Sequence, residues 1–237
     1  QPYQKYDYLS YSNKPYNVLR GFKAVGLFKD EKDVLNSPTQ FGNVRPGDIK
    51  YKDVTGDGKI TDDDKVPLSY SPFPRLMYGF GAEVRYKDFT LGLLFKGRGR
   101  TDFFKNNNGY GYLPFYGGNT GNVLSMVKDQ SNRWTPAWYS GDPKTENPNA
   151  IFPRLTYGKN ENNDKFSSFW LGDSRYLRFE ELTVNYNLRM AALKRLLGVN
   201  SIDLQFVGHN LYVWDKVKIW DPEQADKNGY AYPFLSA

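Results

Sequence analysis

Hydrophobic and polar positions alternate most regularly between Leu76 and Gly97. Residues 75–86 and 89–97 each place apolar side chains on one face and small or charged ones on the other, because successive side chains of a strand point to opposite sides. The apolar positions are Leu76, Tyr78, Phe80, Ala82, Val84, Tyr86, Phe89, Leu91, Leu93 and Phe95, and the opposite positions include Glu83, Arg85, Thr90 and Lys96. Since only residues 86–88 lie between the two runs, the pattern predicts a tight β-hairpin. A transmembrane β-barrel and a half-buried hairpin of a soluble β-sandwich both have such faces.

Further strands are predicted at 18–28, where the alternation is weaker, and at 176–188 and 201–213. Between the last two, residues 190–197 (MAALKRLL) fit a short amphipathic helix that ends before Gly198. A possible helical turn lies at Asp30–Leu35.

The connections between these strands differ in length. They are short at 86–89 and 188–201, whereas long segments fill 29–75 and 98–175. Outer-membrane barrels sort short periplasmic turns and long extracellular loops to opposite ends, and a soluble sandwich has no reason to do so. We therefore expect an all-β fold of antiparallel transmembrane β-barrel strands with long extracellular loops, whose apolar faces contact lipid.

Composition removes several classes of function. The chain has no cysteine and one histidine, His209, which excludes thiol chemistry, disulfides and sites built from several histidines. The net charge of +6 is spread among many acidic residues, so no basic patch for nucleic acid is visible. Glu180 and Glu181 are adjacent and should face opposite sides of a strand, so they form no carboxylate pair of the glycosidase kind. We expect no enzymatic activity, and a packed or hydrogen-bonded role for His209.

One segment of the 29–75 loop, DVTGDGKITDDD at 53–64, has the spacing of an EF-hand calcium loop. The predicted calcium ligands are Asp53, Thr55, Asp57, the carbonyl of Lys59, and Asp64, with Gly58 at the sharp turn. The alternative is a polar Asp-Gly turn without an ion, which the same residues favour. A calcium ion here would be structural, because the flanking segments do not resemble the helices of a calcium sensor.

Exposed aromatic residues in the 98–175 loop form a candidate substrate site, because aromatic rings can stack on sugar rings. The candidates are Tyr112, Trp134, Trp138 and Tyr139, beside Tyr110 and Tyr116. The alternative is that these rings pack the loop against itself.

Taken together, the motifs resemble the C-terminal part of the SusC/RagA family of TonB-dependent outer-membrane transporters from Bacteroidetes. The matching pieces are GFKAVGLFKDEKDV at 21–34, PGDIKYKDVTGDGKITDDDK at 46–65, RLMYGFGAEVRYKDFTLGLLFKG at 75–97, RWTP at 133–136, FPRL at 152–155, WLGDSRYLRFEELTVNYNL at 170–188, GHNLYVW at 208–214 and DPE at 221–223. No single piece is specific, but their order is, and they cover nearly the whole of residues 1–237.

The resemblance implies a parent protein with a plugged barrel of about 22 strands. It implies import of glycans across the outer membrane, driven by TonB and aided by a SusD-like surface lipoprotein that closes over the barrel. The alternatives are peptide import within the same family, or a secreted, calcium-stabilised carbohydrate-binding β-domain. Because the plug and a closing strand are not seen in the sequence, we expect the chain to be a piece of that larger protein.

Overall fold

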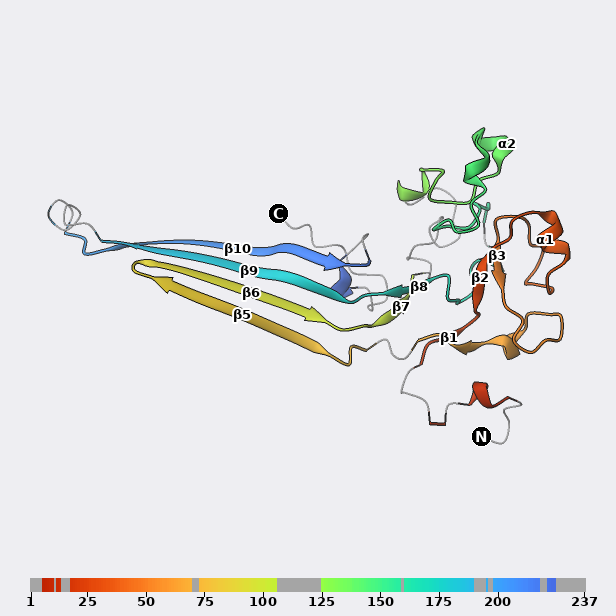
Figure 1. Cartoon of the computed structure of the whole chain (residues 1–237), viewed down its shortest axis with the longest axis horizontal. Coiled ribbons are helices and arrows are strands. Elements are labelled where there is room, and N and C mark those ends of the chain that lie inside the picture. The colour runs from red at the N-terminus through yellow and green to blue at the C-terminus, as the bar shows by residue number, and fades with distance from the viewer. Residues whose placement is uncertain are drawn as a thin grey trace. The chain divides into compact units, whose positions relative to one another are not determined.

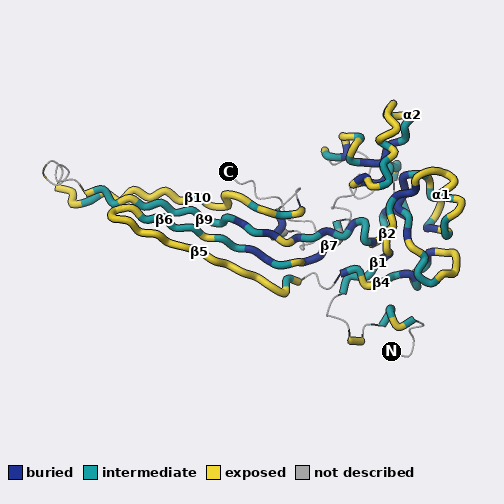
Figure 2. The backbone as a smooth tube through the Cα atoms, in the orientation of Figure 1, coloured by how far each residue is buried: buried dark blue, intermediate teal, exposed yellow. Residues whose placement is uncertain are grey.

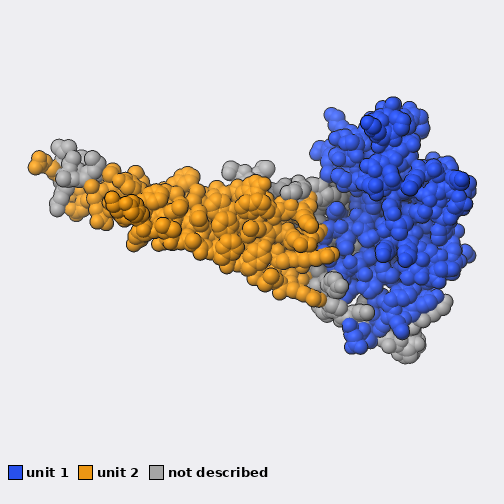
Figure 3. Space-filling view, in the orientation of Figure 1, with its two compact units in different colours: residues 1–72, 102–172, 226–231 blue, residues 73–101, 173–225, 232–237 orange. Residues whose placement is uncertain are grey.

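The computed structural model describes residues 6–10, 12–13, 18–69, 73–105, 125–158, 160–189, 195, 198–217 and 221–224. The chain divides into two compact units, coloured separately in Figure 3. The loop unit comprises residues 1–72, 102–172 and 226–231, and the sheet unit comprises residues 73–101, 173–225 and 232–237.

Four long antiparallel strands make the sheet unit (Figure 1). They are β5 (Met77–Tyr86), β6 (Phe89–Arg98), β9 (Tyr176–Leu188) and β10 (Ile202–Asp215), and their order across the sheet is β10-β9-β6-β5. A two-residue turn, in which Lys87 has a φ of 54°, joins β5 to β6. The predicted hairpin and the predicted strands at 176–188 and 201–213 are therefore present, with ends that differ by at most two residues.

The strand register aligns the apolar positions in rows that cross all four strands. Tyr86, Phe89, Tyr186 and Leu204 form one row; Val84, Leu91, Val184 and Phe206 the next; Ala82, Leu93, Leu182 and Gly208 the central one; Phe80, Phe95, Phe179 and Tyr212 the fourth; Tyr78, Gly97, Leu177 and Trp214 the last. Stacked rings join Phe80 to Phe95 and Phe95 to Phe179, with centroids 5.2 Å and 4.8 Å apart. Aromatic side chains therefore dominate the outer rows, and aliphatic ones the centre.

A bulge in β9 overturns the expectation that Glu180 and Glu181 face opposite sides. The register with β6 shifts between Leu94 and Phe95, which inserts one extra residue of β9. Glu180 lies 3.0 Å from Lys96, and Glu181 accepts a hydrogen bond of 2.8 Å from Thr183. Both carboxylates therefore lie on the polar face, because the extra residue reverses the alternation at that point.

The predicted first strand, 18–28, is wrong as a member of this sheet. The segment forms two short strands in the loop unit: β1 (Arg20–Gly21) pairs with β4 (Val66–Pro67), and β2 (Ala24–Leu27) pairs with β3 (Ile49–Tyr51). A bulge between Ala24 and Gly26, where φ is 127°, interrupts the alternation. The side chains of Phe22 and Phe28 are almost fully buried in the core of the loop unit, so tertiary packing decides the place of this segment.

The remaining elements of the loop unit are short. They are α1 (Glu31–Leu35), β7 (Asp102–Phe104) paired with β8 (Leu171–Asp173), α2 (Ala137–Ser140), and the 3-10 turns Asp7–Leu9, Asp62–Asp64, Ser125–Val127 and Pro143–Thr145. Another 3-10 turn, Pro222–Gln224, belongs to the sheet unit. The predicted turn at Asp30–Leu35 is confirmed as α1, whereas the predicted helix at 190–197 lies outside the described residues except for Arg195.

The two long loops share one hydrophobic core instead of forming separate loops. Its largest buried side chains include Phe22, Phe28, Ile49, Tyr51, Phe152 and Trp170. The free edge of β3 is covered by amide side chains: Asn163 Oδ1 accepts from the Ile49 amide at 2.9 Å, and Asn162 donates to the Ile49 carbonyl at 2.6 Å. In Figure 2 the buried residues are concentrated in the loop unit, whereas β5 of the sheet unit is exposed along its whole length.

Among the described residues, no helix combines the length and the hydrophobicity needed to span a membrane.

Candidate functional site

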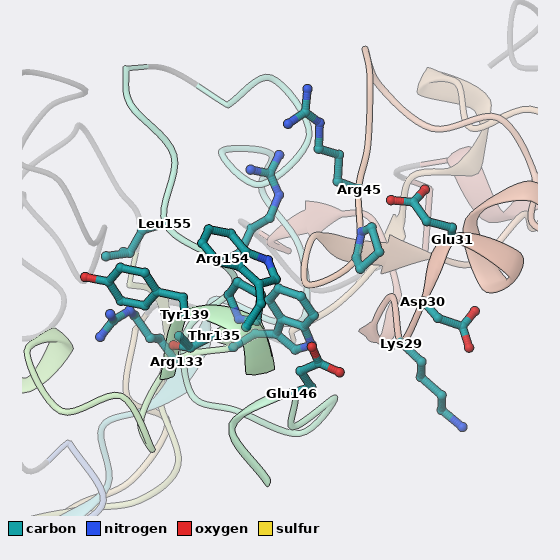
Figure 4. A pocket seen from close by; sticks show the side chains of 14 residues that line it. Lys29, Asp30, Glu31, Arg45, Arg133, Thr135, Tyr139, Glu146, Arg154 and Leu155 are labelled. Carbon is teal, nitrogen blue, oxygen red and sulfur yellow. The ribbon is translucent and has the colours of Figure 1, made fainter. Parts of the chain in front are cut away.

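A cavity of about 660 Å³ opens on the loop unit, between the stretch that contains α1 and Pro46 and the stretch 133–155 (Figure 4). Its volume lies in the range of ligand pockets, about 300–1,000 Å³. Figure 4 shows Lys29, Asp30 and Glu31 on one side of the cavity, and Tyr139 and Leu155 on the other.

The turn Arg45–Asp48 forms one wall of the cavity, and the buried carboxylate of Asp48 fixes its conformation. Asp48 is fully buried, and its Oδ2 accepts hydrogen bonds from the Arg45 amide at 2.8 Å and from Arg154 Nη2 at 2.9 Å. Its Oδ1 accepts from the side-chain amides of Asn160 and Asn163, at 3.1 Å and 2.8 Å. Arg154 Nε lies 2.9 Å from the same Oδ1. These partners compensate the cost of burying the charge and lock the turn to the 154–163 segment.

Trp134 packs directly on this turn. Gly47 has a φ of 84°, and a Cβ atom built there would lie 2.3 Å from the indole ring. Only glycine tolerates both the dihedral angle and the contact. The backbone of Trp134 is held in turn by its amide, which donates to the Phe152 carbonyl at 3.0 Å. Trp134 is therefore a buried wall of the cavity.

Two more aromatic rings project from α2, which begins after Pro136 and ends at Gly141 in the left-handed conformation. Glu146 Oε1 accepts the free amide of Ala137 at 2.8 Å, which caps the first turn. Trp138 and Tyr139 are 84% and 60% exposed and meet edge to face, with centroids 5.9 Å apart. Two large rings this exposed are available to a ligand.

Charges of both signs surround the rings, and several already have partners. Arg154 is bound to Asp48, Arg133 donates to the Val127 carbonyl at 2.7 Å, and Asp30 caps α1 by accepting from the Asp33 amide. Arg45 and Glu31 are exposed, and their side chains have no hydrogen bond or ion pair with the residues that the structure describes.

Asp33, in the middle of α1, has a perturbed pKa. Burial raises it, but the Lys50 side chain, 2.7 Å away, and the Lys29 amide outweigh burial and bring the pKa below its usual 3.8. The carboxylate is therefore held in its charged form and fixes α1 to β3.

Three of the four predicted substrate residues, Trp134, Trp138 and Tyr139, line this one cavity, while Tyr112 lies outside the described residues. The ring of Trp134 is buried, as in the alternative in which the aromatic rings pack the loop against itself. Only the rings of Trp138 and Tyr139 are exposed. Sequence reasoning missed Arg45 and Glu31 as cavity residues. The pieces PGD at 46–48, RWTP and FPRL converge on this cavity from distant positions, and only the structure reveals that they meet.

The predicted calcium loop is closed by its own amides. Asp53 accepts from Gly56 at 2.6 Å and from Gly58 at 2.8 Å, and Asp64, which is fully buried, accepts from Val54 at 2.8 Å and from Thr61 at 2.8 Å. Burial raises the pKa of Asp53, but the hydrogen bonds from Gly58 and Gly56 outweigh it and leave the pKa below 3.8. Within the described part of the chain, no three acidic, histidine or cysteine residues cluster as metal ligands would.

This geometry fits an Asp-Gly turn, and the carboxylates of Asp53, Asp57 and Asp64 would have to reorient to share an ion. Calcium binding through these residues, Thr55 and the Lys59 carbonyl stays a prediction. If it occurs, Asp57→Ala should abolish the calcium dependence of proteolysis within 29–75, because one of few charged ligands is lost. Limited proteolysis with calcium and with chelator measures this. A digestion pattern that chelation leaves unchanged in the unaltered protein would mean that the segment is a turn alone.

The sheet unit carries a second polar cluster, on its polar face around Arg178. This side chain is largely buried, and its Nη2 donates to both oxygens of Asp221, at 2.7 Å and 2.6 Å. Lys96 lies 3.0 Å from Glu180 and 3.1 Å from Glu223. The DPE segment at 221–223 is thereby tied to β6 and β9. His209 is exposed on the same face, with Nδ1 3.6 Å from Glu181, and forms no catalytic arrangement with the residues described.

No protein-family model matches the chain. Two curated proteins of Formosa agariphila do. The chain is 27% identical to TonB-dependent receptor P26 over 90% of its length, and 24% identical to TonB-dependent receptor P3 over 88%. The chain is homologous to a segment of the TonB-dependent receptors. It spans about one fifth of these relatives, 20% of the first and 18% of the second. TonB-dependent receptors are outer-membrane proteins, and the homologues are transporters, not enzymes.

Solved structures share the fold of this chain. It superposes on the RagAB peptide importer in the 'open-open' state with a TM-score of 0.54 and 17% identity, over 86% of this chain and 19% of that one. For the RagAB peptide transporter the TM-score is 0.53 and the identity 19%, over 88% and 20%. The antiparallel sheets thus match part of that fold, and the described residues contain no closed barrel.

Proposed function

We propose that the receptor from which this segment comes imports short peptides across the outer membrane, using TonB as its energy source and a SusD-like lipoprotein as its partner. The two solved structures described above are of a peptide importer, which favours peptide over the glycan expected from the sequence. Glycan import by the same machinery is the alternative, because aromatic rings line the cavity of the loop unit.

The observation that carries a membrane role is the division of the sheet into two faces. Apolar rows cross all four strands, with aromatic rings at both ends, while Glu83, Arg85 and Lys96 lie on the opposite face. β5 and β6 have ten residues each, and about 9–11 residues of a tilted strand cross a bilayer. We therefore assign the apolar face to lipid and the polar face to the lumen of a barrel.

Neighbouring strands of the parent receptor would complete this barrel. Among the described residues, β5 and β10 each pair on one side only. Unpaired backbone groups cannot be satisfied in hydrocarbon, so a spanning sheet needs partners at both edges. The long segments 29–75 and 98–175 both leave from the strand ends opposite the short turns, which is the arrangement of extracellular loops.

The test is uptake by cells that carry the full-length receptor and its lipoprotein partner. We expect accumulation of a labelled peptide mixture that disappears when TonB is deleted or when the receptor is absent. A labelled oligosaccharide mixture supplied in parallel should not accumulate. TonB-dependent uptake of the oligosaccharides without the peptides would reverse the substrate assignment, and no TonB-dependent uptake of either would contradict the transport proposal.

A further inference from the structure

We infer that the cavity between Arg45 and Trp138 is a binding site for the free ends and apolar side chains of short peptides. This inference rests on the proposed function and names a site for its substrate. Two open aromatic rings line this cavity of about 660 Å³, together with the exposed side chains of Arg45 and Glu31, neither of which pairs with another residue that the structure describes (Figure 4).

The fixed backbone of Arg45 supports this inference. Its backbone amide is bound by the buried carboxylate of Asp48, and the Asp48 amide returns a hydrogen bond of 3.0 Å to the Arg45 carbonyl. Gly47 presses the turn against Trp134. Because the backbone below is fixed, a ligand that binds the guanidinium does not have to order the turn, which lowers the cost of binding.

Charge decides between peptide and sugar. Arg45 can take a carboxylate in a charge-assisted pair, and Glu31 can take an ammonium group. A short peptide with free ends carries both charges, whereas a neutral oligosaccharide carries neither and an acidic one only the negative charge. Trp138 and Tyr139 offer apolar contact area to the side chains of the peptide. A zwitterionic peptide is therefore the occupant that uses all of these groups.

The experiment is calorimetric titration of the purified full-length receptor with defined probes. The first probe is the peptide Gly-Ala-Phe-Ala-Gly with free ends, and the second is the same peptide acetylated and amidated. Maltohexaose and tetragalacturonate represent neutral and acidic sugars. Receptor variants Arg45→Gln and Trp138→Ala change the site, and Tyr157→Ala is the matched control, because this aromatic side chain is 88% exposed and does not line the cavity.

We expect the free peptide to bind. The capped peptide should bind at least about tenfold more weakly, because it lacks both charges. Arg45→Gln should weaken the free peptide by about tenfold and Trp138→Ala by about fivefold, with no change for Tyr157→Ala. Equal binding of free and capped peptide, no peptide binding, unchanged affinity in both cavity variants, or preferential binding of either sugar would overturn the inference.

Peptide uptake measured on the same variants separates this inference from the proposed function. If the receptor imports the peptide while Arg45→Gln and Trp138→Ala bind it normally, the cavity is not the site, yet peptide import stands. If the receptor imports no peptide, the proposed function itself is contradicted.

Discussion

Replacing Asp48 with alanine is expected to destabilise the loop unit by about 3–5 kcal/mol, the usual cost of breaking a buried ion pair by removing one partner. The substitution leaves Arg154 without its anion and Asn160 and Asn163 without an acceptor. It also releases the Arg45 amide, so the turn under the cavity loses its anchor.

Hydrogen exchange of the full-length protein, read by mass spectrometry, reports this effect locally. Segments covering 45–51 and 152–163 should exchange at least about a hundredfold faster in Asp48→Ala, while the strands β6 and β9 keep their protection. The control is Asp62→Ala, which removes an exposed pair with Lys65 and should cost less than about 1 kcal/mol. Equal protection in Asp48→Ala and in the unaltered receptor would show that the buried pair does not hold the unit.

If the proposed membrane role is correct, arginine in place of Leu182 should block assembly of the full-length protein in the outer membrane. Leu182 lies in the central apolar row, between Leu93 and Gly208. A charged side chain on the lipid face near the bilayer midplane costs about 2–4 kcal/mol. Little heat-modifiable, folded receptor should be recovered from the membrane fraction.

The neighbouring substitution Thr183→Arg is the matched control, because it places the same side chain on the opposite face. Thr183 donates a hydrogen bond to Glu181 and pairs with Gly92 of the neighbouring strand β6. An arginine at position 183 therefore has a carboxylate nearby. We expect near-normal assembly. If both variants assembled equally well, the apolar face would not contact lipid, and the secreted β-domain would be the better description.

Much of the sheet could be predicted because its signal is local. Alternation with a period of two requires only neighbouring residues, so the strands from Met77 to Arg98 and from Tyr176 to Leu188 appear in the structure close to where the pattern places them. The candidate site was only partly predictable. Trp138 and Tyr139 stood out as aromatic loop residues, but nothing local in the sequence connects them with Arg45 or Glu31.

What the sequence by itself determined is therefore the amphipathic character of the long strands, the short and long connections between them, and the resemblance to TonB-dependent receptors. The tertiary structure alone decided where residues 18–28 pair, since burying Phe22 and Phe28 in a core outweighs their weak alternation. It also decided the shared face of Glu180 and Glu181, because a bulge exists only relative to a partner strand. The convergence of the Arg45 turn and Trp138 on one cavity likewise depends on Asp48, whose buried charge must find Arg154 and two asparagines from a distant segment.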